Sequence, residues 1–360
     1  MVSFEKFLTS VLYYAERGYP LPVAFKRAKE KHKVRANYDE LYEKSRLLIL
    51  SYFSLNGKKR SQKVRQFLYA SSRPVFPEWM REELSKYLDV DALERSLPNK
   101  FTWFRVNALK ADEDKVLKRL AERGIEFERD KDFPFIYRLL KGDLTKTEEF
   151  NKYEVVIQDK ASVAVVMALN PSREEIVIDL ASAPGIKAEL IAELTDNKAK
   201  MILSDIDIGR LEKERFLLKK FGVNMDKVEF VRQDSSYLPE LRADKVLLDA
   251  PCSSSGMINN EPSILLTLKD NRKVKHYAEL QRGILREALK IKAKEMVYAV
   301  CSLFYEEGEA HFEKIGHATE RPLNVGSNGY SPRVSSVRFF SSVHFTESFF
   351  ITKVKLEKLR

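Results

Sequence analysis

The chain has 360 residues, of which 44% are hydrophobic and 32% are charged, and its formal net charge at pH 7 is +10. This length exceeds that of a single typical core and predicts two or three domains. The composition is that of a soluble globular protein. Because no apolar run approaches the roughly 18 residues that span a bilayer, and no apolar stretch typical of a secretion signal occurs near the start, we expect a cytoplasmic protein without membrane spans.

The positive charge is concentrated at the start of the chain. Residues 1–75 contain 16 Lys and Arg but six Asp and Glu, whereas the other 285 residues contain 47 of each sign. Lys and Arg displace counterions from phosphates, so a local surplus is typical of a module that binds a polyanion such as nucleic acid. The alternative is a solvated helix surface in a basic protein.

From Phe4 to about Leu97 the apolar residues recur near helical spacing, which predicts an all-helical first domain at residues 1–97. Gly, Pro and Asn interrupt this pattern at 18–22, 56–57 and 74–77. A basic tract lies within it at Lys58, Lys59, Arg60, Lys63 and Arg65.

A different pattern begins at Pro98 and predicts a small α/β subdomain over residues 98–152. Its expected elements are a strand at 101–106, a helix at 112–124 and strands at 125–128 and 136–140.

Residues 153–360 alternate short apolar segments with longer amphipathic ones, and they are predicted to form the last domain. The expected strands lie at 176–180, 200–204, 228–232, 245–248 and 296–300. Short buried-type strands that alternate with helices predict an α/β fold with a doubly wound, mostly parallel sheet. Two late strands, at 334–340 and 348–354, are expected to pair antiparallel at its edge.

The turn after the first predicted strand of this domain has features of a ligand-binding loop. It contains Asp179-Leu-Ala-Ser-Ala-Pro-Gly-Ile-Lys187 and leads into a predicted helix at 188–194. In an open α/β sheet the ligand binds beyond the carboxyl ends of the strands. Gly185 lets the backbone approach a ligand there, and the helix N-terminus favours an electronegative group. The turn lacks the G-x-G-x-x-G dinucleotide pattern, and an ordinary strand-to-helix loop is the alternative.

Acidic residues follow the next two predicted strands. Asp205 lies 26 residues after Asp179, a spacing at which a carboxylate can accept both ribose hydroxyls of a nucleoside. Gln233-Asp234 follows the third strand, where it can meet the amino group of adenine. Each acid alone could be a solvated loop residue, but their recurrence after successive strands favours an adenosyl site.

The two cysteines of the chain, Cys252 and Cys301, are too few for a disulfide framework and do not form the Cys and His clusters of a zinc site. Cys252 follows the fourth predicted strand in Asp249-Ala-Pro-Cys252, and Cys301 directly follows the fifth. A buried cysteine is often no more than a small hydrophobic residue. Because both cysteines end consecutive strands beside an acid and several hydroxyls, we predict that they take part in chemistry.

Taken together, these motifs identify a resemblance to the Sun/Fmu (NOL/NOP/Sun) family of RNA cytosine-5 methyltransferases, over most of the chain. The helical first domain is similar to the NusB-like RNA-binding domain of the ribosomal RNA branch. The motifs that carry the resemblance are Arg105-Val-Asn107, Gln158-Asp159 with Ala161-Ser162, Ala183-Pro-Gly185 with Lys187, Asp205 with Arg210, Asp234, Asp249-Ala-Pro-Cys252-Ser, Cys301-Ser302 with Glu306-Glu307, and Phe349-Phe350.

The resemblance implies a Rossmann-like domain that uses S-adenosylmethionine to methylate cytosine carbon 5 in RNA, ribosomal RNA rather than transfer RNA, with no metal and as a monomer. It implies that Cys301 is the nucleophile, that Cys252 is needed for product release, and that Asp249 meets ring nitrogen 3 of the base. The residues implied to bind the cofactor are Ala181, Ser182, Ala183, Pro184, Gly185, Ile186, Lys187, Asp205, Arg210, Asp234 and Asp249.

Four positions depart from the family pattern: Ile186 replaces a second loop glycine, Ala188 a threonine, Val300 a threonine, and Ser254 a glycine. Because a β-branched residue disfavours positive φ, Ile186 is expected to narrow the approach to the methionine end of the cofactor.

Two other functions remain open from the sequence. One is methylation of another acceptor such as an amine, for which Asp-Pro-Pro-Tyr or Asn-Pro-Pro-Tyr is expected in place of Asp249-Ala-Pro-Cys252. The other is RNA binding without catalysis, against which the retention of Asp249 and both cysteines argues.

Overall fold

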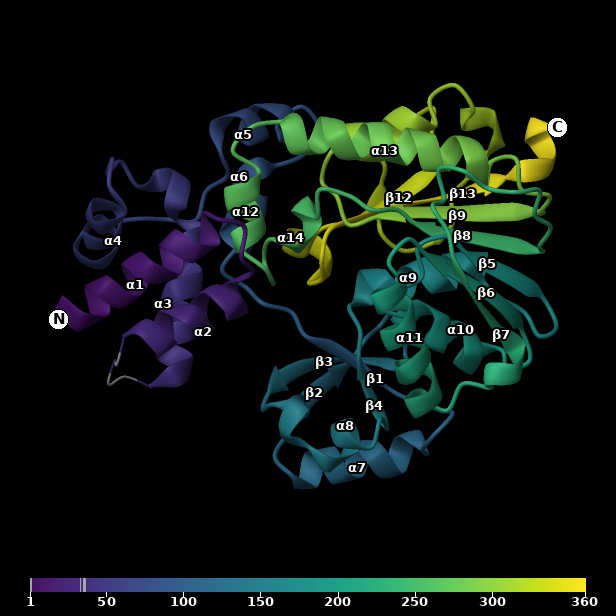
Figure 1. Ribbon diagram of the computed structural model, residues 1–360, viewed down its shortest axis with the longest axis horizontal. Coiled ribbons are helices and arrows are strands. Elements are labelled where there is room, and N and C mark those ends of the chain that lie inside the picture. Colours follow the sequence, from purple (N-terminus) through teal and green to yellow (C-terminus); the bar gives the residue numbers. More distant parts are fainter. Residues whose placement is uncertain (1, 33, 35–36) are drawn as a thin grey trace.

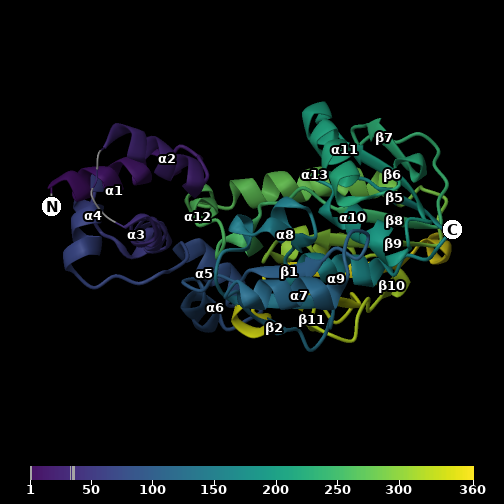
Figure 2. The same cartoon turned by 90° about the horizontal axis from the view of Figure 1, so that it is seen from below.

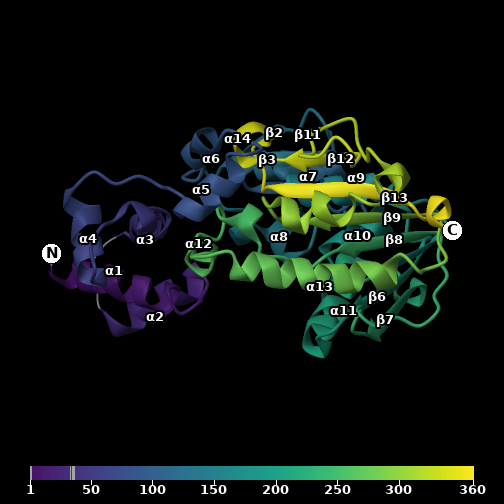
Figure 3. The same cartoon turned by 90° about the horizontal axis from the view of Figure 1, so that it is seen from above.

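The computed structural model describes residues 2–32, 34 and 37–360 and has the α/β architecture expected from the sequence. The helices of the first hundred residues gather at one end, the large sheet lies toward the other, and a small sheet with its own helices lies beside it (Figure 1). The two rotated views show the same separation of the N-terminal helices from the C-terminal end (Figures 2 and 3).

The first part of the chain is helical, as predicted. Its helices are α1 (Val2–Ala15), α2 (Leu21–Lys31), α3 (Tyr38–Leu50), α4 (Arg60–Tyr69), α5 (Glu78–Leu84) and α6 (Val90–Ser96). Local chemistry fixes the ends: the Asn37 side chain accepts the N–H groups of Asp39 and Glu40 at the start of α3, and Asp89 caps α6 in the same way. The apolar faces of α1 to α4 meet around Phe7 and Phe25, which contact edge to face.

A segment from the far half of the chain completes this helical region. Helix α12 (Ser263–Thr267) packs against α3, and its Leu266 belongs to the same apolar cluster as Phe7 and Phe25. The fully buried Arg46 of α3 donates to the carbonyl oxygens of Leu97, Pro98 and Asn259. The helices are thus fastened to the segment that follows Cys252 by both apolar and polar contacts.

The small sheet has the strand order β2-β3-β1-β4 and pairs antiparallel throughout. Its elements are β1 (Trp103–Val106), α7 (Glu113–Glu122), β2 (Glu126–Arg129), β3 (Ile136–Lys141), α8 (Glu148–Asn151) and β4 (Val155–Ile157). The first three strands and α7 coincide with the predicted elements within about two residues. Strand β4 was not predicted, and it extends this sheet beyond residue 152; the division into three domains stays a prediction.

The large sheet has the order β11-β12-β13-β9-β8-β5-β6-β7, with β10 beside β13. The run from β9 to β7 is parallel, whereas β13 pairs antiparallel with β9 and β12, as predicted for the two late strands. The elements are α9 (Lys160–Leu169), β5 (Ile176–Asp179), α10 (Ile186–Leu194), β6 (Lys200–Asp205), α11 (Ile208–Phe221), β7 (Val228–Arg232), β8 (Lys245–Asp249), α12, α13 (Arg272–Ala288), β9 (Glu295–Val300), β10 (Thr319–Glu320), β11 (Ser327–Asn328), β12 (Ser336–Phe339), α14 (Ser341–His344) and β13 (Phe349–Lys355).

Helices cover both faces of this sheet, α13 on one side and α9, α10 and α11 on the other (Figure 1). Successive strand residues point to opposite faces, so Val246 and Leu248 pack with Ile284 of α13 while Leu247 packs under α9 and α10. This doubly wound arrangement leaves the carboxyl ends of the parallel strands as the edge where a ligand can bind.

The part of the chain that the structure describes contains neither a candidate membrane span nor a candidate metal site. None of its helices combines the length and the apolarity that a membrane crossing requires. Its His, Cys, Asp and Glu side chains form no cluster suited to a metal ion.

Candidate active site

A cavity of about 410 Å³ opens at the carboxyl ends of the parallel strands. It lies where the strand order reverses, because β5 has β6 on one side and β8 on the other. The loops after β5, β6, β7 and β8 line it, and α13 closes one wall. The structure therefore has a cavity at the place where the sequence predicted a ligand site.

The loop after β5 turns sharply at Gly185, whose φ of 94° is the left-handed conformation that glycine tolerates. A Cβ atom added there would lie 2.8 Å from Cγ of Glu214, so space as well as conformation favours glycine. Ile186 is the first residue of α10 and lines a separate cavity with Phe150 and Phe221. Gly185 takes up the positive φ, and the Ile186 side chain lies outside the cavity it was expected to narrow.

Asp205 is buried at the end of β6 and forms an ion pair with Arg210, with Oδ2 and Nη1 3.0 Å apart. Arg210 also donates to the carbonyl oxygen of Ala183 and so ties the loop after β5 to α11. Asp179 lies deeper, where burial and the charges of Asp249 and Asp205 raise its pKa to about 7. Carboxyl groups thus gather around the cavity, with Asp205, Asp234 and Asp249 in its lining and Asp179 buried close to two of them.

Of the residues predicted to bind the cofactor, six line the cavity: Ala181, Ala183, Asp205, Arg210, Asp234 and Asp249. Ser182, Pro184, Gly185, Ile186 and Lys187 do not line it. Ser182 is buried and its Oγ donates to Glu214. Gly185 contributes only its backbone, as the N-cap residue of α10. Ala188 belongs to the apolar core beneath α10.

Several cavity residues carry no motif and were missed by sequence reasoning. His276, Tyr277, Leu280 and Ile284 of α13 form the wall that faces Asp205 and Asp234. An amphipathic helix does not reveal which of its half-exposed residues will cover a ligand site, so only the sheet order could have located this wall.

The two cysteines meet beside this cavity, with their Sγ atoms 3.0 Å apart. Their strands, β8 and β9, are adjacent and parallel, which brings the residues after both strands to the same edge. Both are free thiols. The hydrogen bond to Cys252, burial and the negative charges of Asp249 and Glu347 raise the pKa of the Cys301 thiol well above its ordinary value.

Asp249 is paired with Lys187, with Oδ2 and Nζ 2.5 Å apart. Although burial lowers the pKa of Lys187, the charges of Asp249, Asp179 and Cys301 raise it above its ordinary value. Lys187, predicted to bind the cofactor, thus contacts Asp249 of the cavity lining without lining the cavity itself.

Buried Glu307 joins the loops that carry the two cysteines. Its carboxylate accepts hydrogen bonds from the N–H and Oγ of Ser253, from Oγ of Ser302 and from Nε2 of Gln281. Gln281 also donates to the carbonyl oxygen of Pro251, so both neighbours of Cys252 are held. Burial raises the pKa of Glu307, although these hydrogen bonds act to lower it.

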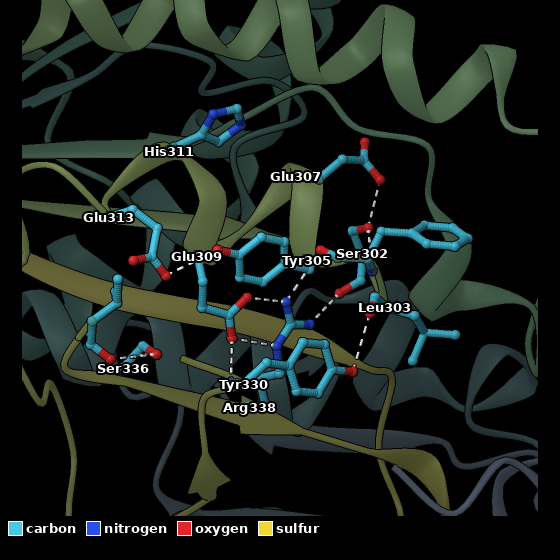
Figure 4. Close-up of polar contacts among 12 residues, drawn as sticks. Ser302, Leu303, Tyr305, Glu307, Glu309, His311, Glu313, Tyr330, Ser336 and Arg338 are labelled. Atoms are coloured by element: carbon cyan, nitrogen blue, oxygen red, sulfur yellow. Dashed lines mark hydrogen bonds and ion pairs between the residues drawn. The ribbon is translucent and has the colours of Figure 1, made fainter. Parts of the chain in front are cut away.

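A second buried network supports the loop after Cys301 from the opposite side (Figure 4). The guanidinium of Arg338 donates to both carboxylate oxygens of Glu309 and to the carbonyl oxygens of Ser302 and Phe304. Tyr330 lies against this guanidinium at 3.8 Å and donates to the carbonyl oxygen of Leu303. Sequence patterns give no hint of it, because a buried arginine looks like a surface one.

Glu347 approaches the cysteines from the segment before β13. Its carboxylate accepts from Nδ2 of Asn260, and burial together with the charge of Asp159 raises its pKa to about 8. Backbone hydrogen bonds join this segment to the loops of both cysteines. The N–H of Ser348 donates to the carbonyl oxygen of Gly256, and the N–H of Gly256 donates to the carbonyl oxygen of Cys301.

Comparison with known proteins agrees with this geometry. The model of the 16S rRNA methyltransferase RsmB/F family matches residues 166–355, which include both cysteines and every loop of the cavity. The chain belongs to the RsmB/F family.

Relatives act on more than one kind of RNA. The chain is 32% identical over 242 residues to the probable ribosomal RNA small subunit methyltransferase B of Bacillus subtilis, covering 65% of this chain and 54% of that protein. It is 33% identical over 226 residues to a tRNA (cytosine(72)-C(5))-methyltransferase of Pyrococcus horikoshii, covering 60% and 56%. The chain thus spans about half the length of these relatives.

The likeness in fold extends to nearly the whole chain. The crystal structure of PH0851 superposes with a TM-score of 0.81 at 23% identity, and the match covers 98% of each chain. The fold described above, a Rossmann-like methyltransferase sheet joined to N-terminal helices, therefore has a counterpart of the same extent in PH0851.

Proposed function

We propose that this chain is an S-adenosylmethionine-dependent methyltransferase that methylates carbon 5 of a cytosine in ribosomal RNA through a covalent bond to Cys301. One observation carries the proposal: two free thiols lie 3.0 Å apart, beside Asp249, which lines a cavity suited to a nucleoside. Membership in the RsmB/F family supports the same reaction.

The cavity fits S-adenosylmethionine in its chemistry. The Asp205 carboxylate can accept the ribose hydroxyls, Asp234 can accept the adenine amino group, and Ile206, Leu280 and Ile284 offer apolar surface to the ring. The loop around Ala183 presents backbone to the methionine part. When bound, this cofactor supplies an electrophilic methyl group.

Cytosine carbon 5 is too weak a nucleophile to accept the methyl group unaided. Attack of the Cys301 thiolate on carbon 6 makes carbon 5 enamine-like, which divides one difficult step into easier ones. Asp249 is suited to hold a proton at ring nitrogen 3 and so to neutralise the developing charge. After methyl transfer a base removes the carbon 5 proton, and the Cys301 sulfur leaves carbon 6.

Cys252 is positioned to act in this last stage. Its sulfur is hydrogen-bonded to that of Cys301, and Glu307 and Gln281 hold the residues on either side of it. A thiol fixed in this way can exchange a proton with the reacting centre while the other cysteine carries the base. We therefore assign attack to Cys301 and elimination to Cys252.

The N-terminal helices supply the contact surface for RNA. Lys26, Lys29 and Lys31 of α2 are exposed, as are Lys58 and Lys59 before α4. Phosphate contacts by such a surface contribute binding energy that can help a base leave its stack and reach the cysteines. Ribosomal RNA is the first candidate from the family, and transfer RNA is the second because of the 33%-identical relative that modifies it.

Incubation of the full chain with ribosomal and transfer RNA, with and without S-adenosylmethionine, tests the proposal. We expect a gain of one methyl mass on ribosomal RNA, mapped to cytosine carbon 5, and none with Cys301→Ala. Modification of transfer RNA instead would select the second substrate. A methyl group on any atom other than carbon 5, or full activity of Cys301→Ala, would contradict the mechanism.

A further inference from the structure

Aromatic and cationic side chains gather at the start of α3. Tyr38 and Tyr42 lie one helical turn apart, with ring planes within 13° of parallel and centroids 6.3 Å apart. The ammonium group of Lys29, from α2, lies 4.8 Å from the centre of the Tyr38 ring. That of Lys100, from the segment before β1, lies 4.9 Å from the centre of the Tyr42 ring. Together these four residues form the tyrosine track.

The outer part of the tyrosine track is open to solvent. The Tyr38 side chain is 53% exposed, although its ring contacts Phe25 edge to face. Lys29 and Lys100 are exposed as well. Because every base has a π-face, an exposed aromatic ring that is held in place offers a stacking surface to single-stranded nucleic acid of any sequence.

The charges around the track suit a polyanion. In the part of the chain that the structure describes, neither Lys29 nor Lys100 forms an ion pair with a carboxylate. Glu40 and Glu43, which lie near the tyrosines on α3, are paired with cations of the same helix. Asp39 lies in the first turn of α3, where the helix dipole favours a carboxylate. Both lysines are therefore available to phosphate groups.

The inner part of the track adjoins the segment that leads to the cysteine site. Asn99, next to Lys100, accepts a hydrogen bond through its carbonyl oxygen from Nδ2 of Asn259 at 3.2 Å. The next residue, Asn260, donates to the carboxylate of Glu347. Helix α12, which follows these asparagines, packs against α3 (Figure 1). A strand that lies along the track is thus led toward the loops of the two cysteines.

We propose that the tyrosine track binds a single-stranded stretch of RNA beside the target cytosine, with one base stacked on Tyr38 and phosphates at Lys29 and Lys100. This inference rests on the proposed function, because it names the part of the RNA that the N-terminal helices hold. The stretch must be unpaired, since only a splayed base can stack on a side chain. The track therefore differs from Lys58 and Lys59, whose contacts with phosphates depend on charge alone.

Photocrosslinking and binding titrations of the full chain, without cofactor, test the proposal. The probe is a short single-stranded RNA that contains 5-iodouridine, a base that crosslinks to aromatic rings stacked on it. We expect a crosslink that peptide mass spectrometry maps to Tyr38. Tyr38→Leu retains an apolar contact with Phe25 but removes the ring, so it should abolish this crosslink and weaken binding about tenfold. Tyr38→Phe keeps the ring and should bind like the parent.

Tyr69→Leu is the matched control, because Tyr69 is 63% exposed and lies on α4, outside the track. It should bind the single strand like the parent. Lys100→Met should weaken binding and reduce its salt dependence by about one counterion, because it removes a phosphate contact but leaves the rings. Duplex RNA should bind equally to the parent and to Tyr38→Leu. Equal affinity of the parent and Tyr38→Leu for the single strand, or an equal loss in Tyr69→Leu, would overturn the proposal.

Methylation kinetics separate this surface from the reaction. Tyr38→Leu should raise the KM for RNA and leave kcat near that of the parent, because the cysteine site is unaltered. Methylation with an unchanged KM in Tyr38→Leu would contradict the tyrosine track and leave the proposed function in place. Binding of the single strand through Tyr38 without methylation of any RNA would support the track and contradict the proposed reaction.

Discussion

Glu214 offers a direct test of the electrostatics beneath the cofactor loop. It lies fully buried on α11, where its Oε2 accepts a hydrogen bond from Oγ of Ser182. Its Oε1 is buried without a hydrogen-bond partner among the described residues. Burial, and then the charges of Asp179 and Asp205, raise its pKa to about 8, so the group is protonated at neutral pH.

The raised pKa of Glu214 predicts the direction in which the free energy of unfolding changes with pH. Above pH 4.5 an unfolded chain carries Glu214 ionised, while the native state keeps it protonated until about pH 8. Folding therefore takes up a proton in this interval, and the free energy of unfolding falls as pH rises through it, by about 3 to 5 kcal/mol over the whole range. Glu214→Gln cannot ionise and should escape this loss.

Thermal unfolding of the parent and Glu214→Gln at pH 5 and pH 8 measures the effect. We expect similar midpoints at pH 5 and a midpoint higher by about 5 °C or more for the variant at pH 8. Glu212→Gln, at an exposed position of the same helix, is the control and should follow the parent at both values. A difference between parent and Glu214→Gln that is the same at both pH values would refute the buried, protonated assignment.

Three further predictions concern the proposed reaction. Asp205→Ala removes the carboxylate assigned to the ribose hydroxyls and should weaken S-adenosylmethionine binding about ten- to a hundredfold by calorimetry, with RNA binding retained; an unchanged Kd would remove Asp205 from the site. Cys252→Ala should accumulate a covalent RNA adduct that survives denaturing electrophoresis, whereas Cys301→Ala should form none; the opposite pattern would exchange their roles. Replacing Lys58 and Lys59 by Ala should weaken RNA binding and reduce its salt dependence by about one to two counterions in a binding titration, and an unaltered salt slope would place the RNA elsewhere.

Much of the large sheet could be predicted because its central strands are short, continuous apolar runs. Strand β7 matches its predicted range to the residue, and β5, β6, β8 and β9 differ by one residue at an end. Strand β4 was missed because Val155, Val156 and Ile157 carry too little pattern alone. Their place is set by pairing with β1, some fifty residues earlier in the chain, which local sequence does not encode.

The same contrast between local sequence pattern and long-range contacts applies to the candidate site. The grouping of Cys252, Cys301 and Asp249 could be predicted because Asp249 ends β8, Cys252 lies three residues beyond it and Cys301 directly follows β9, and adjacent parallel strands bring such residues to one edge. Arg338 was missed because its role depends on burial and on neighbours from distant segments. The outcome at Ile186 has a similar origin: the glycine before it supplies the positive φ, so the branched residue begins the helix without strain.

The contacts of Asn259 and Asn260 link the helical region to the cysteine site. Asn259 donates to the carbonyl oxygens of Ser96 and Asn99 and accepts from Arg46, while the next residue, Asn260, donates to Glu347 beside the cysteines. Leu265 and Leu266 add apolar contacts to the N-terminal helices. Deleting those helices would expose these leucines to water and remove the hydrogen-bond partners of Asn259. Surface substitutions, which leave this segment intact, are therefore the sound way to separate RNA binding from chemistry.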